Sequence, residues 1–192
     1  AGFKAELIYS VPKASQGSWV SMTPDSKGRL YVSDQAGSLF RVTAALGNRL
    51  TTVEPVDLDI GQAQGLCWAF DSLYVVVNSM KVAHESGLYR LRDTDGDDKL
   101  DEITPLKSFM NRGKNGPGWG EHGPHGITLG PDKKLYIVAG NFTSLPKGLA
   151  PTSPAQNWSE DLLLQRMTDG KGHDPTIYAR AGDVPALVLL AL

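Results

Sequence analysis

Short apolar runs alternate with polar, glycine-rich and proline-rich breaks along most of this chain. Three segments share one order: a short apolar strand, a turn that contains aspartate, a strand that contains Leu-Tyr, and a small or polar break. They are Gly17–Thr43, Ala63–Leu91 and His125–Asn141. Tyrosine and valine favour the half-buried face of a pleated sheet, and proline, aspartate and glycine favour tight turns. Each segment therefore predicts an antiparallel hairpin.

The spacing of the repeat predicts a larger architecture. The first two Leu-Tyr pairs, at Leu30 and Leu73, are separated by the length of one four-stranded propeller blade, which is about 40–45 residues. The third pair, at Leu135, follows after the length of a blade and an insertion. Closed propellers have about four to eight blades, so about three to four blades are expected here. We expect an all-β chain, with residues 1–192 forming a single partial β-propeller domain that is truncated at the C-terminus.

The C-terminal part departs from this repeat. Residues 146–192 are expected to be irregular, beginning with a loop rich in proline, serine and threonine. Within them, Trp158–Met167 predicts a short helix, with Ser159 as its N-cap residue and acidic residues in its first turn. The longest apolar run, Val184–Leu192, is too short to cross a bilayer as a helix, which takes about 20 residues. No membrane span is therefore expected.

The composition of the chain is that of an ordinary globular protein and gives no sign of a nucleic-acid partner. The chain is 41% hydrophobic and 21% charged, with a formal net charge of -2, as in an ordinary globular protein. Its lysines and arginines are scattered, so we expect no nucleic-acid partner. The single cysteine, Cys67, lies in the apolar run GLCWAF and is expected to be a small buried side chain.

An acidic loop, DTDGDDKLDE, carries the strongest chemical signal in the chain. Aspartates at positions 1, 3 and 5 of a short loop are typical of EF-hand-like calcium sites, where position 7 contributes a backbone carbonyl and position 9 a further oxygen. Such closely spaced carboxylates repel each other unless a cation holds them together. The sequence predicts a structural calcium site with the candidate ligands Asp93, Asp95, Asp97, Lys99, Asp101 and Glu102.

Two positions depart from the calcium pattern. Position 6, normally glycine, is Asp98, and position 12, normally a bidentate glutamate, is Thr104. Asp101 or Glu102 would have to replace that glutamate. The alternative interpretation is a solvated acidic hairpin loop without an ion.

A second loop holds a glutamate and two histidines among glycines. Glu121, His122 and His125 are candidate catalytic residues, since histidine titrates near neutral pH and serves as a general base, and Glu121 would orient one imidazole. Pro124 opposes a regular helix here, so a helical zinc motif is not indicated. The alternative is that the histidines hydrogen-bond the loop backbone.

The runs GEHGPHGITLGPDKKLYIVAGN and GLYRLRDTDGDDKLDE resemble the membrane-bound dehydrogenase propeller domain of planctomycete and verrucomicrobial proteins. Those proteins are similar to soluble quinoprotein glucose and sorbosone dehydrogenases. The resemblance, over roughly Gly17–Met167, implies a six-bladed propeller, a pyrroloquinoline quinone (PQQ) cofactor, a sugar or alcohol substrate and an extracytoplasmic location, in the periplasm or at the cell surface. It also implies a cytochrome c domain elsewhere in the full-length protein. This chain itself has no CxxCH motif, so no covalent c-type haem site is expected in it.

The resemblance also implies roles for particular residues. His122 lies eight residues before Gly130, which is the spacing of the general base in those enzymes, whereas His125 lies five residues before it. Asn141 stands where the enzymes carry aspartate, so His122 and Asn141 are the candidate cofactor-binding residues. The arginine or glycine pair that usually follows the histidine is absent, which is a departure from the family pattern.

Three functions fit these features. The first is a PQQ-type dehydrogenase that oxidises a sugar or alcohol, with a structural calcium loop. The second is a non-catalytic, calcium-stabilised propeller that binds a carbohydrate or a protein. The third is a propeller hydrolase of the lactonase type, with a catalytic calcium beside Glu121 and Asn141. The fold alone does not choose between them, because propellers host many functions.

Overall fold

The computed structural model describes residues 2, 3, 5–44, 50–79, 83–109, 120 and 123–140. Among these residues the only helix is the short α1 (Lys13–Gln16), and the rest of the regular structure is antiparallel β-sheet. The first sheet contains β1 (Trp19–Pro24), β2 (Leu30–Asp34), β3 (Leu39–Thr43) and β4 (Thr52–Pro55). The second contains β5 (Ala63–Ala69), β6 (Ser72–Val77), β7 (Gly87–Arg92) and β8 (Glu102–Ser108). The third pairs β9 (Pro124–Leu129) with β10 (Leu135–Ala139).

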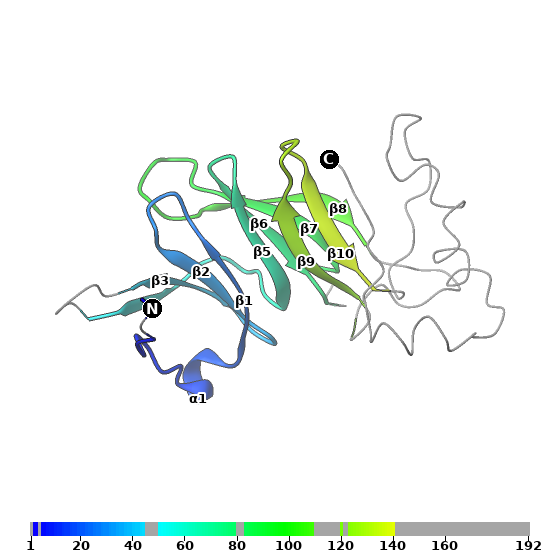
Figure 1. Ribbon diagram of the computed structural model, residues 1–192. Helices are drawn as coiled ribbons and strands as arrows, with labels where there is room; N and C mark the ends of the chain where they lie inside the picture. The colour runs from blue at the N-terminus through cyan, green and yellow to red at the C-terminus, as the bar shows by residue number, and fades with distance from the viewer. Residues whose placement is uncertain are drawn as a thin grey trace.

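The predicted hairpins and the all-β class are confirmed. Each Leu-Tyr pair lies at the start of the second strand of its sheet: it opens β2 and β10, and it follows Ser72, the first residue of β6. In each of these strand pairs the register shifts near the start of the first strand. The shifts lie between Trp19 and Ser21 of β1, between Ala63 and Gly65 of β5, and, opposite the start of β9, between Ile137 and Ala139 of β10. The three sheets are thus variations on one pattern, and in the described residues they form an open array rather than a closed ring (Figure 1).

The first strands of neighbouring sheets pack against each other. β1 contacts β5, and β5 contacts β9. Two hydroxyls on β1 accept hydrogen bonds from backbone N–H groups of β5: Leu66 donates to Ser21 Oγ at 3.1 Å, and Trp68 donates to Thr23 Oγ1 at 3.2 Å. The ring of Tyr31 on β2 stacks on Trp68 with a centroid separation of 5.6 Å. The contact between the first and second sheets is therefore specific as well as apolar.

The second sheet is the middle layer of the core. Alternate side chains of β6 point to opposite faces of the sheet, as strand geometry requires. Leu73, Val75 and Val77 pack in the cluster shared with the first sheet, whereas Tyr74 and Val76 pack in the cluster shared with β9 and β10. This burial on both faces explains why LYVVV is continuously apolar instead of alternating.

Three further sequence predictions concern Cys67, membrane-spanning helices and the C-terminal segment. Cys67 is buried, 8% exposed, within the cluster between the second and third sheets, as predicted. No helix in the described part of the chain is long and apolar enough to cross a membrane. The irregular segment 146–192 and the helix at Trp158–Met167 lie outside the described residues.

Candidate functional site

The acidic loop connects β7 to β8 and is organised by its own carboxylates. Asp93 accepts two backbone hydrogen bonds, from Gly96 at 2.7 Å and from Asp98 at 2.8 Å. Asp95 accepts the N–H of Asp97 at 3.1 Å. Gly96 and Asp98 both adopt positive φ angles, 81° and 71°. Asp98 therefore takes a left-handed conformation that usually favours glycine, and aspartate is among the few other residues that tolerate it.

Three of the predicted metal ligands lie together. Asp93, Asp95 and Asp101 each offer one carboxylate oxygen, and these oxygens lie within 4.8 Å of one another. Thr94 orients Asp101, because its N–H and hydroxyl donate to the Asp101 carboxylate at 3.0 and 2.9 Å. A set of carboxylate oxygens is suited to a hard cation such as Ca²⁺ and poorly suited to softer transition metals.

The side chains of the other predicted ligands are directed elsewhere. The Asp97 carboxylate accepts the Lys99 N–H at 2.9 Å and lies 3.7 Å from the Lys99 ammonium. Glu102 is already on β8, where it pairs with Arg92 at 3.1 Å and accepts the Thr104 hydroxyl at 2.8 Å. The bond from Thr104, followed by that from Arg92, lowers the pKa of Glu102. The carboxylates of Asp97 and Glu102 thus lie outside the group formed by Asp93, Asp95 and Asp101, whereas the predicted role of the Lys99 backbone carbonyl stays a prediction.

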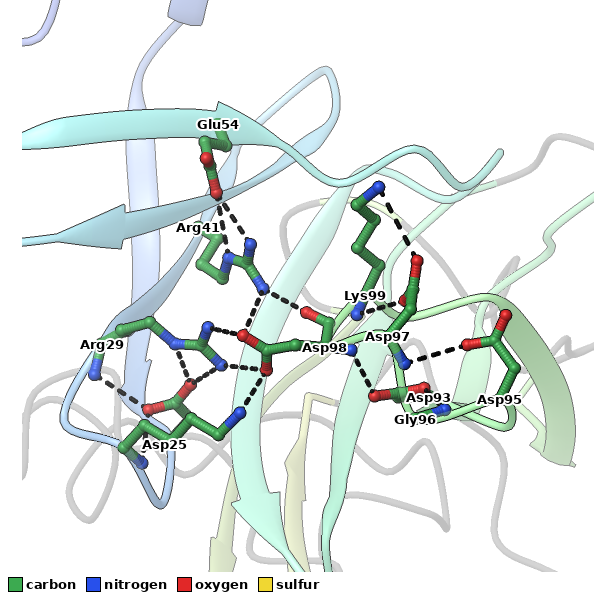
Figure 2. A network of polar contacts seen from close by, with 11 residues as sticks. Asp25, Arg29, Arg41, Glu54, Asp93, Asp95, Gly96, Asp97, Asp98 and Lys99 are labelled. Atoms are coloured by element: carbon green, nitrogen blue, oxygen red, sulfur yellow. Dashed lines mark hydrogen bonds and ion pairs between the residues drawn. The ribbon is translucent and has the colours of Figure 1, made fainter.

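The side chain of Asp98 points away from the other loop carboxylates and connects the second sheet to the first. Its carboxylate accepts hydrogen bonds from Arg29 Nη2 at 2.9 Å and Lys27 Nζ at 2.7 Å, and its backbone carbonyl accepts one from Arg41 (Figure 2). Arg29 is held in turn by Asp25, whose Oδ2 accepts the Arg29 Nε–H at 2.7 Å. We call these five residues the Asp98 clasp.

The clasp shifts the ionisation of both main partners. Hydrogen bonds from Arg29, and then from Lys27, hold the pKa of Asp98 well below its usual range. The same bond to Asp98 is the main reason that the pKa of Arg29 is raised. Sequence reasoning noted Asp98 only as a departure from the calcium pattern. The one signal in the sequence for a special role of Asp98 was that an aspartate replaces the expected glycine. Its partners could not be identified from the sequence, because Arg29 and Lys27 are 69 and 71 residues away in the chain.

The second candidate loop begins in a tight turn. The N–H of Gly123 donates to the carbonyl of Gly120 at 2.9 Å, and we call this contact the Gly120–Gly123 turn. Both backbone groups of Gly120 bond to the side-chain amide of Asn78, which follows β6: Asn78 Nδ2 donates to the carbonyl at 2.7 Å, and Asn78 Oδ1 accepts the N–H at 2.7 Å. The N–H of Gly140, at the end of β10, donates to the carbonyl of Gly123 at 2.9 Å.

Only part of the predicted catalytic set is described. Glu121, His122 and Asn141 lie outside the described residues, although the turn positions on either side of Glu121 and His122 are described. His125 is partly buried on β9. A Cβ added at Gly65 of β5 would clash with the backbone carbonyl of His125, so these two strands approach more closely here than a side chain would allow.

The acidic loop and the Gly120–Gly123 turn lie at opposite ends of the second sheet. β6 and β7 are antiparallel, with Leu73 paired to Leu91 and Val77 paired to Gly87. The acidic loop follows the end of β7, which is the Leu73 end of β6, whereas Asn78 follows Val77. The acidic loop and Asn78 are therefore separated by the length of the β6 and β7 strands.

Comparisons with known proteins assign no family to the chain. No protein-family model matches it. A search of curated proteins also finds no significant match. The dehydrogenase resemblance therefore stays a prediction that depends on the residues quoted for it.

Proposed function

We propose that this chain is part of a β-propeller dehydrogenase of the quinoprotein type, which oxidises a hydroxyl group of a sugar or alcohol. The main support is the position of the Gly120–Gly123 turn. It directly precedes β9, and β9 continues the row in which β1 and β5 already lie side by side. In a ring of such sheets the first strands line the central channel, so residues of this turn would face the substrate.

His122 is the proposed general base, and His125 and Glu121 are its neighbours in the loop. The base takes the proton from the substrate hydroxyl, which requires a neutral imidazole within hydrogen-bond reach of that hydroxyl. Glu121 would hold the ring orientation, and Asn141 would contact the cofactor. A quinone, when bound, supplies the acceptor for the hydride.

The described residues fit a quinone only in part. PQQ carries carboxylates, which need cationic partners. The described polar contacts at the turn are with the neutral amide of Asn78 and with the backbone of Gly140. The arginines and lysine of the Asp98 clasp lie at the other end of the sheet stack, so they do not supply this charge. The described residues at the turn therefore do not supply the cationic partners that the carboxylates of PQQ need.

Calcium has a separate, structural role in this proposal. The oxygens of Asp93, Asp95 and Asp101 would bind the ion, and the neighbouring Asp98 would connect the ordered loop to the first sheet. The clasp favours this role over a catalytic one because it ties the loop to the first sheet rather than to the Gly120–Gly123 turn.

Dye reduction by the protein with added PQQ tests the proposed function across a panel of sugars and alcohols. We expect substrate-dependent reduction that falls at least about 100-fold in His122→Gln, since general-base catalysis contributes about 10²–10⁴-fold. His84→Gln is the matched control, because His84 lies in a different loop with its ring against Tyr89. Absence of activity with every substrate would contradict the proposal and favour a non-catalytic binding propeller.

A further inference from the structure

The acidic loop contains a peptide bond that is open to a covalent rearrangement. Among the described residues, Asp95 is the only aspartate that is followed by glycine, and both Asp95 and Gly96 are exposed. Glycine presents its backbone nitrogen without a side chain beside it, and a Cβ built at Gly96 would meet nothing within 4 Å. No steric barrier therefore keeps the Gly96 nitrogen from the side-chain carboxyl group of the residue before it.

The rearrangement is an intramolecular condensation followed by hydrolysis. The Gly96 nitrogen forms a bond to Asp95 Cγ, and the hydroxyl of the carboxylic acid leaves as water together with the proton of the Gly96 N–H. Water then opens the resulting succinimide ring. When water attacks the former backbone carbonyl of Asp95, the product is isoaspartate, in which the main chain runs through the Cβ of residue 95. The water that is lost in the first step is regained in the second, and no oxidant or cofactor takes part.

Two hydrogen bonds oppose ring closure in the structure. The Gly96 N–H donates to Asp93 Oδ1 at 2.7 Å, so the attacking nitrogen is held toward a different carboxylate. The Asp95 carboxylate accepts the N–H of Asp97 at 3.1 Å, so it is engaged with the residue beyond Gly96 (Figure 2). Because closure would break both bonds, the loop itself slows the reaction that its sequence permits.

We propose that Asp95–Gly96 is a site of spontaneous isoaspartate formation in the folded protein, and that Asp93 restrains the reaction by holding the Gly96 amide. Isoaspartate would add a methylene group to the main chain between Asp93 and Asp98. The spacing that lets Asp93 accept the N–H groups of both Gly96 and Asp98 would then be lost, and the Asp98 clasp would loosen. This inference does not depend on the proposed dehydrogenase activity.

The test is to age the whole protein at 37 °C and pH 6 in EDTA and to measure isoaspartate by tryptic digestion and fragmentation mass spectrometry. Trypsin cuts before Asp93 and after Lys99, so Asp95 is measured separately from the other Asp-Gly pair of the chain, Asp169–Gly170. We expect isoaspartate at residue 95 in the wild type, formed about five- to tenfold faster in Asp93→Ala, since losing one hydrogen bond to a charged group shifts a local opening equilibrium by about that factor. The rate at Asp169 should stay unchanged and serves as a reference in the same sample.

Asp132→Ala is the matched control, because Asp132 also accepts a backbone N–H within a turn, from Lys134 at 3.2 Å, but lies between β9 and β10. Its rate at residue 95 should equal that of the wild type. Asp93→Asn keeps an oxygen acceptor, so its rate should lie between those of the wild type and Asp93→Ala, and it decides the question if the alanine variant does not fold. Absence of isoaspartate at residue 95 in every variant would reject the site. A rate in Asp93→Ala that is unchanged or lower would overturn the restraint, and a lower one would show that Asp93 accepts the Gly96 proton as a base.

Discussion

At its two ends the second sheet makes polar contacts with its neighbours, in addition to the packing of β5 against β1 and β9, and these two junctions are built from different chemistry. At one end, the Asp98 clasp joins the acidic loop to the first sheet through charged side chains, and the Asp98 side chain is 42% exposed. At the other end, Asn78 joins β6 to the turn before β9 through a neutral amide. Each junction uses one side chain from a loop of the second sheet: Asp98 lies between β7 and β8, and Asn78 directly follows β6.

The two junctions differ in how strongly they depend on salt and in how precisely they fix geometry. Exposed ion pairs contribute little each and are weakened by salt, so several charges must gather on Asp98 to make a useful contact. Neutral amide bonds are nearly independent of salt and fix two directions at once. We expect the charged end to tolerate small movements and the amide end to hold the turn in one geometry.

Gly65→Ala should produce the largest effect, at the histidine end. The added Cβ would clash with the backbone carbonyl of His125, so β5 and β9 would have to separate. We expect a loss of about 3 kcal/mol in the free energy of unfolding, measured by urea denaturation. Gly126→Ala is the matched control, because its Cβ meets nothing within 4 Å. Equal losses in the two variants would show that the strands are not in close contact here.

Calcium should act at the acidic end alone. A ligand that binds only the folded state at 100 times its Kd stabilises that state by about 2.7 kcal/mol. We expect the Tm of the protein to rise by several degrees with Ca²⁺ over EDTA, and Asp93→Asn and Asp101→Asn to abolish the rise. Asp132→Asn, in the turn between β9 and β10, should keep it. An EDTA-insensitive Tm would reject the calcium site and leave the clasp unaffected.

Asp98→Asn should give the smallest of these effects, about 1 kcal/mol at pH 7 and low salt. Asparagine tolerates the positive φ of this position, so the change removes mainly the charge. The pKa of Asp98 is lowered in the folded state, so its contribution is complete above the unfolded value of about 3.9 and is lost as pH falls toward the folded value.

Urea denaturation from pH 7 to pH 3 measures this dependence. The difference in free energy of unfolding between the wild type and Asp98→Asn should begin to shrink below about pH 4, and it should also shrink in 1 M NaCl. A difference that is independent of both pH and salt would mean that Asp98 acts through its conformation and not through its charge.

Local sequence patterns predicted much of the fold. The Leu-Tyr pairs located β2, β6 and β10, and the apolar run around Cys67 predicted its burial. The alternating aspartates predicted a group of carboxylates, and Asp93, Asp95 and Asp101 do lie together. These features depend on strand periodicity, turn chemistry and close spacing in the chain, which are visible in any short window.

The contacts between sheets were not predictable in the same way. Nothing near Asp98 in the chain indicates Arg29, and nothing near Asn78 indicates Gly120, because each pair is brought together only by stacking one sheet on another. The sequence by itself determined the hairpins of the three repeated segments and the acidic loop, since these depend on neighbouring residues, whereas β4 and β8 were not predicted. Only the tertiary structure decided that Asp98 and Asn78 are the junctions, because the stacking of sheets joins residues 69 and 42 positions apart.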